Sequence, residues 1–366
     1  MKTFIIKPVS YACNLRCDYC YAAFNNNANN ALIKRMDEAT LVRIYSLVTP
    51  QSHIIWHGGE PLLRGTSFYE RALELGKKKH LTYSLTTNAT LMTPAWASFF
   101  KKSKWKVKIS LDGPKHVHNK HRKSKSHNET FDAVMRGVML AKLYKLNFEL
   151  NAVVTTDTLK ENPKKLYRFF VSVWNRFSFA PCWERGLDGK LSPYVIPDKV
   201  FLGYIKKVFD VWWEEDNPAI KIELFESLIS GVLGKNPGLC MFSRHKCADY
   251  LSIEPNGDIY PCGRYNGIEA FKIGNINTMD FEAIRKTRQY ILYLRNSHHL
   301  SDACRACTFR TICNNACVYE RWNGTSFDDT NPYCNTWQGL LTHIKEKIIV
   351  SPYAPNLYEV PRTSKA

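Results

Sequence analysis

The chain has 366 residues, 45% of them hydrophobic, and its 51 lysine and arginine residues against 33 acidic ones give a net charge of +18. A chain of this length and apolar content can bury a large core without disulfide bonds. Its first residues are too poor in apolar side chains for a signal peptide, and no apolar run approaches the ~18 residues of a membrane span. We therefore expect a cytoplasmic protein without a disulfide framework, whose 12 cysteines largely bind metal.

The first predicted elements are a strand at residues 3–9 and a loop at residues 10–23. The loop leaves the C-terminal end of the strand, which is where ligands bind in α/β folds. It contains three cysteines, Cys13, Cys17 and Cys20, in the spacing CxxxCxxC. Three thiolates leave one coordination position of a four-iron cluster open. Structural zinc, which takes four ligands, explains this spacing poorly.

An aromatic residue, Tyr19, precedes the last of these cysteines, where its ring could contact a flat cofactor. The motif resembles CxxxCxφC, the signature of the radical S-adenosylmethionine (SAM) enzymes, in which φ is aromatic. The resemblance implies that the amino and carboxylate groups of SAM chelate the open iron. One electron from the cluster then breaks SAM, and the resulting 5′-deoxyadenosyl radical abstracts a hydrogen atom from an unreactive C–H bond.

Further motifs follow in the order expected for this family. The sequence HGGEP at residues 57–61 comes after a predicted strand at residues 54–56. Taken alone it fits a glycine turn with a solvated glutamate, but behind the cysteine motif it resembles the GGEP segment that holds the SAM amino group. A third strand ends at residues 85–88 and resembles the family's TNG segment, with Ala89 in place of glycine. The resemblance implies a SAM site formed by Tyr19, Gly58, Gly59, Glu60, Asn88, Ser110, Arg122 and Trp183.

Three more strands are predicted at residues 107–111, 150–155 and 177–180, and apolar residues recur at helical spacing between the strands. This alternation predicts a parallel sheet with right-handed crossovers. Six such units fit the partial (β/α)6 barrel of the radical SAM family, so we expect an α/β fold with the barrel at residues 1–200 and a helical connector at residues 201–239. The predicted helices are residues 38–48, 68–75, 95–100, 131–143, 166–174, 201–213 and 225–233.

The second set contains eight cysteines and begins with Cys240. The seven that follow show the pattern Cx9Gx4C, then Cx2Cx5Cx3C, then one final cysteine. It resembles the SPASM domain, which extends many radical SAM enzymes, and Asn256-Gly257 suits the turn of its central hairpin. The resemblance implies a small cysteine-rich SPASM domain at residues 240–345 and an irregular tail at residues 346–366. A zinc-binding interaction module is the alternative for this set. The implied ligands are Cys240, Cys247, Cys262 and Cys317 for auxiliary cluster I, and Cys304, Cys307, Cys313 and Cys334 for auxiliary cluster II.

The expected cofactors are therefore three [4Fe-4S] clusters and SAM. Both auxiliary clusters would be fully ligated by thiolates, so we expect them to transfer electrons rather than bind substrate. The twelfth cysteine, Cys182, is interpreted as a small buried hydrophobic residue. A thiol that faces the substrate is the alternative for this position.

The motifs indicate the chemistry but leave the substrate open. Motif order and length look close to the anaerobic sulfatase maturases, which oxidise a cysteine or serine to formylglycine. Those enzymes carry an aspartate as a base directly after the cysteine that matches Cys262, whereas this chain has Gly263 there. Asp249, Glu184 and Tyr265 are the candidate replacements for this base. We therefore expect a crosslink or related radical modification on side chains of a ribosomally made precursor peptide, with sulfatase maturation as the alternative.

The net positive charge concentrates at residues 77–79, 101–108 and 115–125. A solvated face explains such runs, and electrostatic steering of an acidic leader peptide is the functional interpretation. No stacking motif accompanies the charge, so nucleic acid is not an expected partner. We expect a precursor peptide or protein as substrate and an external electron donor such as flavodoxin or ferredoxin, with no membrane association.

Overall fold

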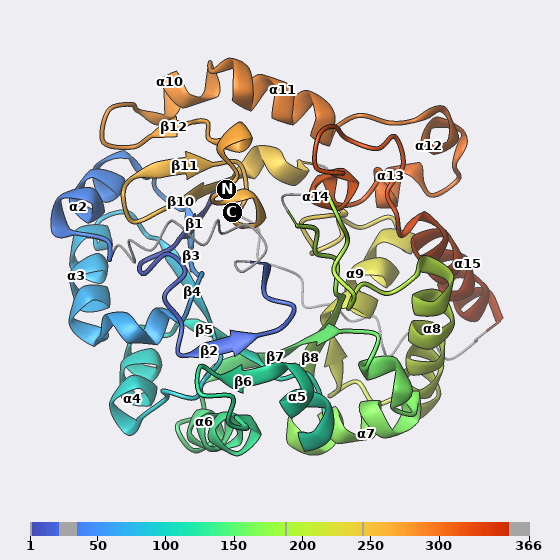
Figure 1. The fold of residues 1–366 in the computed structure, drawn as a ribbon. Coiled ribbons are helices and arrows are strands. Elements are labelled where there is room, and N and C mark those ends of the chain that lie inside the picture. Colours follow the sequence, from blue (N-terminus) through green and yellow to red (C-terminus); the bar gives the residue numbers. More distant parts are fainter. Residues whose placement is uncertain (1, 22–34, 187–188, 244, 351–366) are drawn as a thin grey trace.

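The computed structural model describes residues 2–21, 35–186, 189–243 and 245–350. Its main sheet curves into an open barrel with helices on the outside (Figure 1). From one edge to the other the strands follow the order β12-β11-β10-β1-β3-β4-β5-β7-β8-β9. Their bounds are β1 Thr3–Ile6, β3 His53–Trp56, β4 Thr82–Thr87, β5 Lys106–Ser110, β7 Asn147–Val154, β8 Arg176–Pro181, β9 Lys221–Ile222, β10 Tyr250–Ile253, β11 Asp258–Tyr260 and β12 Gly274–Asn275.

All six strands predicted for the barrel are present as β1, β3, β4, β5, β7 and β8, and they pair in parallel. The partial barrel expected from the alternating pattern is therefore confirmed. Helices cross between the strands on the outer face, and Asp37, Thr93 and Asn162 cap three of them by accepting hydrogen bonds from backbone N–H groups. These crossing helices are α2 Glu38–Leu47, α3 Thr66–Gly76, α4 Pro94–Ser103, α5 Lys115–His121, α6 Phe131–Leu143 and α7 Pro163–Val173.

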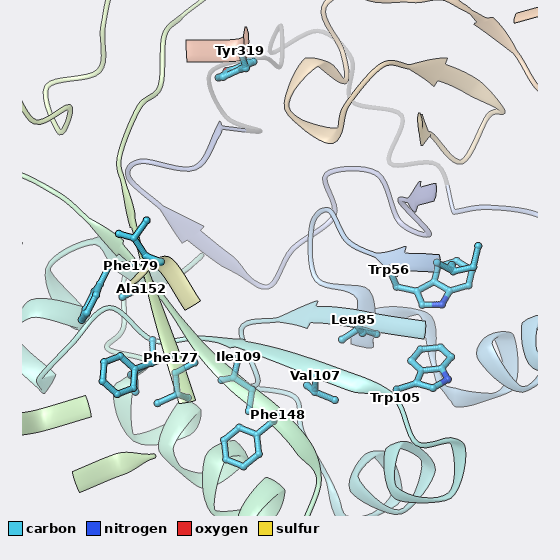
Figure 2. Packing of buried hydrophobic residues seen from close by; sticks show 14 of the residues in the cluster. Trp56, Leu85, Trp105, Val107, Ile109, Phe148, Ala152, Phe177, Phe179 and Tyr319 are labelled. Carbon is cyan, nitrogen blue, oxygen red and sulfur yellow. The ribbon is translucent and has the colours of Figure 1, made fainter. Parts of the chain in front are cut away.

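The core lies between the outer face of the sheet and these helices (Figure 2). Alternate strand residues such as Leu85, Val107 and Phe148 point outward and are buried. The indoles of Trp56 and Trp105 stack at 6.4 Å between ring centroids. This burial fixes the register of each strand, because a slip by one residue would turn its apolar set toward the barrel interior.

The barrel interior is polar at the N-terminal ends of the strands. A cavity of about 190 Å³ lies there, lined by charged residues of β5, β7, β8, β9 and the helix that follows. Glu149 pairs with Lys106 at 2.6 Å and with Lys108 at 2.7 Å. This end lies opposite the loops that carry the motifs, so we assign the ion pairs a structural role.

A two-stranded ribbon was not predicted from the sequence. Strand β2 (Leu15–Cys17) pairs with β6 (Arg122–Ser124), and Cys17 lies opposite Arg122. Figure 1 places this ribbon across the mouth of the barrel. The ribbon joins the first cysteine loop to the loop after β5, although the two are more than 100 residues apart in the chain.

The C-terminal cysteine-rich part continues the barrel sheet. β10 pairs in parallel with β1, and β11 and β12 add antiparallel strands beyond it. The hairpin predicted around Asn256-Gly257 is present, with Gly257 at φ +86°. The remaining helices are α8 Asp198–Glu215, α9 Glu223–Val232, α10 Phe281–Arg285, α11 Arg288–Ser297, α12 Asp302–Ala306, α13 Arg310–Cys313, α14 Val318–Arg321 and α15 Cys334–Val350. Short 3-10 turns are η1 Pro61–Arg64, η2 Thr158–Lys160, η3 Lys246–Asp249, η4 Gly263–Tyr265 and η5 Glu269–Phe271.

Helix α15 packs along α8 and α9. Residues 346–350 belong to this helix, so the prediction of an irregular tail from residue 346 is wrong for them. Two contacts hold them in the helix: Ile348 packs against the core, and Lys347 pairs with Asp210 of α8 at 3.2 Å. Residues 351–366 lie outside the described part of the chain. Among the described helices, none is both long and apolar enough to span a membrane.

Candidate active site

The first cysteine loop places Cys13, Cys17 and Cys20 near enough for their charges to act on one another, with Cys17 at the end of β2. Burial raises the pKa of Cys13 to about 11 and that of Cys17 to about 12, and charge repulsion from Cys20 adds to both shifts. The backbone N–H of Leu15 donates to the Cys13 Sγ at 3.3 Å, and Asn88 Nδ2 donates to the same sulfur at 3.7 Å. Three partly buried thiols whose charges act on one another are suitable ligands for a shared metal cluster, because a bound metal stabilises the thiolate form.

The HGGEP segment turns sharply against this loop. Gly58 and Gly59 have φ values of +90° and +55°, and a Cβ at Gly59 would lie 2.1 Å from the Ala12 carbonyl oxygen. The backbone N–H of Glu60 donates to that same carbonyl at 2.8 Å. Glycine is therefore required for the two loops to touch.

Glu60 is fully buried, and burial raises its pKa to about 7. Its carboxylate accepts hydrogen bonds from the backbone N–H groups of Leu62 and Asn88 and from the Thr87 hydroxyl, at 2.8–3.0 Å. These bonds tie the glycine turn to the end of β4. The predicted role of Glu60 toward SAM is thus joined by a structural one within the protein.

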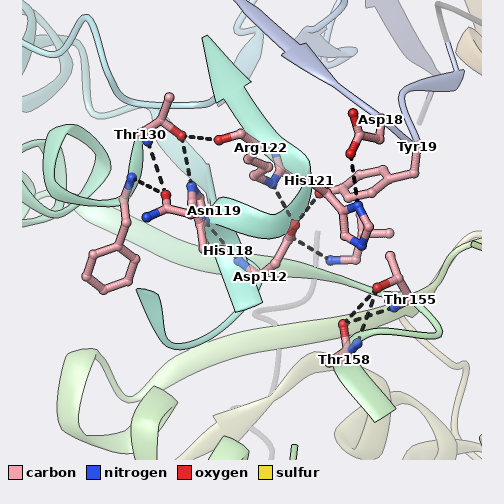
Figure 3. A network of polar contacts seen from close by, with 12 residues as sticks. Asp18, Tyr19, Asp112, His118, Asn119, His121, Arg122, Thr130, Thr155 and Thr158 are labelled. Atoms are coloured by element: carbon pink, nitrogen blue, oxygen red, sulfur yellow. Dashed lines mark hydrogen bonds and ion pairs between the residues drawn. The ribbon is translucent and has the colours of Figure 1, made fainter. Parts of the chain in front are cut away.

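A buried aspartate, Asp112, organises the next part of the site (Figure 3). Its Oδ2 accepts from the Tyr19 hydroxyl and, at 2.9 Å, from Arg122 Nε. Its Oδ1 accepts from the backbone N–H of Val153 at 3.1 Å. Although burial opposes its ionisation, the Arg122 guanidinium holds the pKa of Asp112 below its usual value.

Sequence reasoning did not single out Asp112, although it assigned both Tyr19 and Arg122 to the SAM site. The structure buries both residues, with the Arg122 guanidinium 5.5 Å from the centre of the Tyr19 ring. An aspartate between a strand end and a Gly-Pro turn was the available signal. Asp112 therefore holds the two predicted contacts in place from the barrel side.

Two carboxylates flank His121. The imidazole of His121 is buried, with Nδ1 3.2 Å from Asp18 Oδ2 (Figure 3). Its Nε2 lies 3.1 Å from Asp157 Oδ2. Asp18 sits between Cys17 and Tyr19 in the cysteine loop. This contact, together with the ribbon β2–β6, holds the loop against α5.

The remaining predicted SAM contacts lie at the C-terminal ends of the strands. Ser110 ends β5, Asn88 follows β4, and Trp183 follows β8. All three are at least nine-tenths buried. The Trp183 indole N–H has no hydrogen-bond partner among the described residues. A buried donor without a partner, beside polar groups at strand ends, fits a site completed by a polar cofactor.

The thiols assigned to auxiliary cluster I gather beside β1 and β10. Burial raises the pKa of Cys240, and the charges of Cys317, Cys262 and Cys247 add to that shift. The same burial raises the pKa of Cys317 to about 11. Cysteines from separate segments of the chain thus act electrostatically on Cys240, as we expect for thiols assigned to one cluster.

The thiols assigned to auxiliary cluster II lie toward α15. Burial raises the pKa of Cys334, and the charges of Cys304 and Cys307 raise it further. The Cys307 sulfur accepts from the Phe309 backbone N–H at 3.4 Å. Cys313 ends α13, and the next three residues all have positive φ values of 42–61°. This left-handed turn separates Cys313 from Cys317, the ligand predicted for the other cluster.

The three candidate bases occupy different surroundings. Tyr265 is fully buried among aromatic rings, 4.1 Å from the Phe271 ring centroid. Asp249 lies in η3 near Cys247. Glu184 follows β8 toward the barrel mouth, where burial raises its pKa to about 7 despite the charge of Arg264. Of the three, Glu184 is the one whose strand-end position and pKa suit proton transfer.

Gly263 lies at the start of η4 and has an ordinary backbone conformation. A Cβ built there would lie 3.3 Å from Ile5 Cγ2 and 3.9 Å from Ser252 Oγ. A side chain at this position would thus point to β1 and β10. Cys182 is buried, with its pKa raised by desolvation, and this agrees with its interpretation as a small hydrophobic residue.

Comparison with known proteins places these features in context. The model of the Radical SAM superfamily matches residues 8–170, and that of the iron-sulfur cluster-binding domain SPASM matches residues 245–308. The serine-type anaerobic sulfatase-maturating enzyme of Bacteroides thetaiotaomicron is 31% identical over 93% of this chain and 88% of its own length. The cysteine-type enzyme of Clostridium perfringens is 29% identical over 95% and 97%, respectively.

A solved structure, native anSMEcpe with bound AdoMet (SAM) and the Cp18Cys peptide, superposes on this chain with a TM-score of 0.81 at 27% sequence identity. The match covers 94% of this chain and 99% of that chain. The similarity therefore spans the barrel, the connector and the cysteine-rich part.

Proposed function

Because the chain belongs to the family of radical SAM enzymes with a SPASM domain, which includes the anaerobic sulfatase-maturating enzymes, we propose that it modifies a side chain of a peptide or protein. Its cofactors are [4Fe-4S] clusters and SAM. We propose further that the product is a crosslink or a related radical modification of a ribosomally made precursor peptide, rather than formylglycine.

The cysteine groups described above support two separate roles, radical formation at the first cluster and electron transfer at the other two. When bound, the first cluster and SAM supply the 5′-deoxyadenosyl radical that removes a hydrogen atom from the substrate. Cys13, Cys17 and Cys20 would hold that cluster, and Asn88, Ser110 and Trp183 would line the SAM site. The eight later cysteines would hold the two clusters that carry electrons.

The observation that carries the choice of product is Gly263. In the sulfatase maturases that the chain resembles, an aspartate at this position removes a proton from the substrate, and glycine has no group that accepts one. Crosslinking needs radical formation, bond closure and electron removal, and it does not require a base at this position. Its proton can leave to a group elsewhere in the site, and burial raises the pKa of Glu184 to about 7, which suits this carboxylate to take it. We propose Glu184 as the base in this chain.

Sulfatase maturation is the second candidate, because the relatives named above carry that activity in their names and match along almost their whole length. Incubation of the reconstituted enzyme with SAM, reductant and either a sulfatase-derived peptide or a precursor peptide separates the two. Loss of two hydrogen atoms with an internal crosslink in the precursor peptide supports our proposal. Formylglycine in the sulfatase peptide would overturn it.

A substitution at Gly263 sharpens this test. Gly263→Asp restores the base of the sulfatase maturases, and we expect it to raise formylglycine formation above that of the original chain. Gly263→Ala is the matched control, because it adds the same Cβ 3.3 Å from Ile5 without a carboxylate. Equal activity of both variants would mean that this position does not decide the product.

Two cysteine variants test whether the first cluster cleaves SAM and the later clusters transfer electrons. We expect Cys17→Ala to abolish deoxyadenosine formation, because the first cluster loses a ligand. We expect Cys313→Ala to retain SAM cleavage and lose the modified product. Reductive SAM cleavage by Cys17→Ala, or a full product yield from Cys313→Ala, would contradict these roles. The metal content should be about twelve irons per chain, the sum of three four-iron clusters.

The basic residues near the barrel mouth suggest how a peptide would be attracted. Lys120 and Lys125 are exposed at α5 and the end of β6, and they make no ion pair within the described residues. We propose that this face steers an acidic leader, and that a flavodoxin or ferredoxin supplies the reducing electron. A peptide KM that does not rise with salt or with Lys120→Gln would argue against steering.

A further inference from the structure

A lysine outside all the motifs, Lys7, is fully buried directly after β1. Lysine is almost never fully buried unless its charge is paired. Strand β1 lies between β3 and β10 (Figure 1), so Lys7 lies where the barrel joins the cysteine-rich part. Its backbone N–H donates to the Ile253 carbonyl of β10 at 2.9 Å and extends the pairing of the two strands.

The aliphatic stem of Lys7 packs against the glycine turn that follows β3. A Cβ built at Gly58 would lie 2.6 Å from Lys7 Cγ and 2.7 Å from Lys7 Cδ. The stem therefore occupies the space that a side chain at Gly58 would need. The backbone N–H of His57 donates to the Ile6 carbonyl at 3.0 Å and holds the same turn to β1. The turn that resembles the SAM-binding GGEP segment is thus supported by Lys7.

The ammonium group of Lys7 lies between two rings of the first cysteine loop. Its Nζ is 4.7 Å from the centre of the Tyr11 ring and 5.3 Å from that of the Tyr21 ring. Tyr11 precedes Cys13 by two residues, and Tyr21 directly follows Cys20. Aromatic rings attract cations, and more strongly where water is excluded. One ammonium group thus contacts both ends of the segment that carries the three thiols.

A carboxylate of the cysteine-rich part holds this ammonium group in place. Glu254 directly follows β10, and its Oε1 lies 3.2 Å from Lys7 Nζ, with the two side chains 9% and 0% exposed. The same oxygen accepts from Asn266 Nδ2 at 2.6 Å. Asn266 is fully buried and directly follows η4, the turn after Cys262. Buried contacts therefore connect this turn, through Glu254 and Lys7, to the glycine turn of the barrel.

We propose that Lys7 is a positioning residue of the SAM site, through which Glu254 of the cysteine-rich part fixes the glycine turn and the first cysteine loop. Neither residue belongs to the set of SAM contacts, so both act through Gly58 and the loop. A binding site keeps its geometry when the residues behind it are fixed by packing and by polar contacts of their own. The inference goes beyond the proposed function, because it holds for a crosslink and for formylglycine alike.

The affinity of the reconstituted full chain for SAM, measured by equilibrium dialysis at equal iron content, tests this role. The double variant Lys7→Met with Glu254→Gln removes both charges, leaves no unpaired charge buried and keeps an unbranched side chain against Gly58. We expect its Kd for SAM to rise about tenfold, as is typical when a residue that orients a metal site is removed. Lys7→Ala with Glu254→Gln removes the stem as well, and we expect it to lose SAM binding.

A matched pair of single variants separates positioning from general stability. Glu254→Gln and Glu149→Gln each remove one buried carboxylate from beside a lysine, and the two carboxylates are 7% and 5% exposed. Glu149 lies at the opposite end of the barrel. We expect both variants to unfold at lower urea concentrations, and only Glu254→Gln to raise the Kd for SAM.

The dependence of deoxyadenosine formation on SAM concentration, measured without peptide, gives a second readout. We expect Glu254→Gln to raise the KM for SAM and to change kcat little. A loss of folded protein alone would lower the rate at every SAM concentration and leave the KM unchanged. Glu149→Gln should behave in that second way.

Each outcome bears on a different claim. A Kd equal to that of the parent chain in both double variants would overturn the role of Lys7, and an unchanged Kd in the methionine variant alone would overturn the coupling to Glu254. An equal rise in Kd for Glu254→Gln and Glu149→Gln would reduce the effect to stability and overturn the inference as well. Formylglycine as the product of the parent chain would overturn the proposed function and leave the role of Lys7 intact.

Discussion

Individual side chains at this site are fixed by buried charge pairs. Asp112 binds Arg122, Tyr19 and the backbone of β7, so one carboxylate connects three segments. A buried carboxylate persists only when such partners replace water. The predicted SAM contacts Tyr19 and Arg122 therefore depend on a residue that no SAM motif includes.

We expect Asp112→Asn to destabilise the fold by about 3 kcal/mol, because it leaves the buried Arg122 guanidinium without a counter-charge. Urea unfolding measures this change in the free energy of unfolding. The matched control is Asp132→Asn, since the Asp132 carboxylate pairs with Lys115 at the exposed surface, and it should change stability little. Equal effects of the two substitutions would mean that the buried pair contributes no more to the free energy of unfolding than the exposed pair does.

Glu184 predicts a dependence of stability on pH. Its pKa is raised from 4.5 to about 7, so the unfolded chain loses this proton before the folded chain does. The contribution of Glu184 to stability is thus present below about pH 4.5 and is lost as the pH rises to about 7.

Glu184→Gln cannot ionise, so it should gain stability over the original chain between these pH values, by up to about 3 kcal/mol. Unfolding midpoints at pH 4.5, 6 and 8 measure the difference. Glu74→Gln at the exposed surface is the control and should show no such trend. A difference between Glu184→Gln and the original chain that is independent of pH would show that Glu184 is not held with a raised pKa.

At the scale of elements, the site depends on loops that touch at the C-terminal ends of the strands. The glycine turn after β3 contacts the cysteine loop after β1, and the ribbon β2–β6 ties that loop to α5. These contacts hold the three thiols beside the ends of β4 and β5. Each loop thus takes its shape from its neighbours as well as from its own residues.

Gly59→Ala should disrupt this arrangement, because the added Cβ would lie 2.1 Å from the Ala12 carbonyl oxygen. We expect loss of SAM binding, measured by equilibrium dialysis on the reconstituted enzyme. Gly65→Ala is the control, since Gly65 also has a positive φ of +81° but has no atom within 4 Å of its added Cβ. That variant should bind SAM and lose about 1 kcal/mol of stability through backbone strain alone.

Across the whole molecule, the barrel and the cysteine-rich part share one sheet and one helical layer. The division at residue 240 predicted from the sequence stays a prediction, but β10 pairs with β1 across it and α15 packs on α8. We therefore expect the two parts to unfold together.

Leu340→Ala tests this coupling, because Leu340 is fully buried on α15. It should cost about 2–5 kcal/mol and weaken the protection of β1 and β3 amides against hydrogen exchange along with that of α15. Ile349→Ala on the same helix is the control, because Ile349 is 72% exposed. Loss of protection confined to α15 would show that the two parts unfold separately.

The sequence alone determined the cysteine groups, the strand order of the barrel and the absence of an aspartate at Gly263. Those features are local, because spacing along the chain and alternation of apolar residues carry them. It did not reveal that Asp112 holds Tyr19 and Arg122, or that Arg264 bridges Glu184 and Glu320. Only the tertiary structure decided these contacts, because their members lie up to about a hundred residues apart and meet where parallel strands end at a common edge. Buried charges leave no periodic pattern in a sequence. Their partners can be identified only from the folded structure.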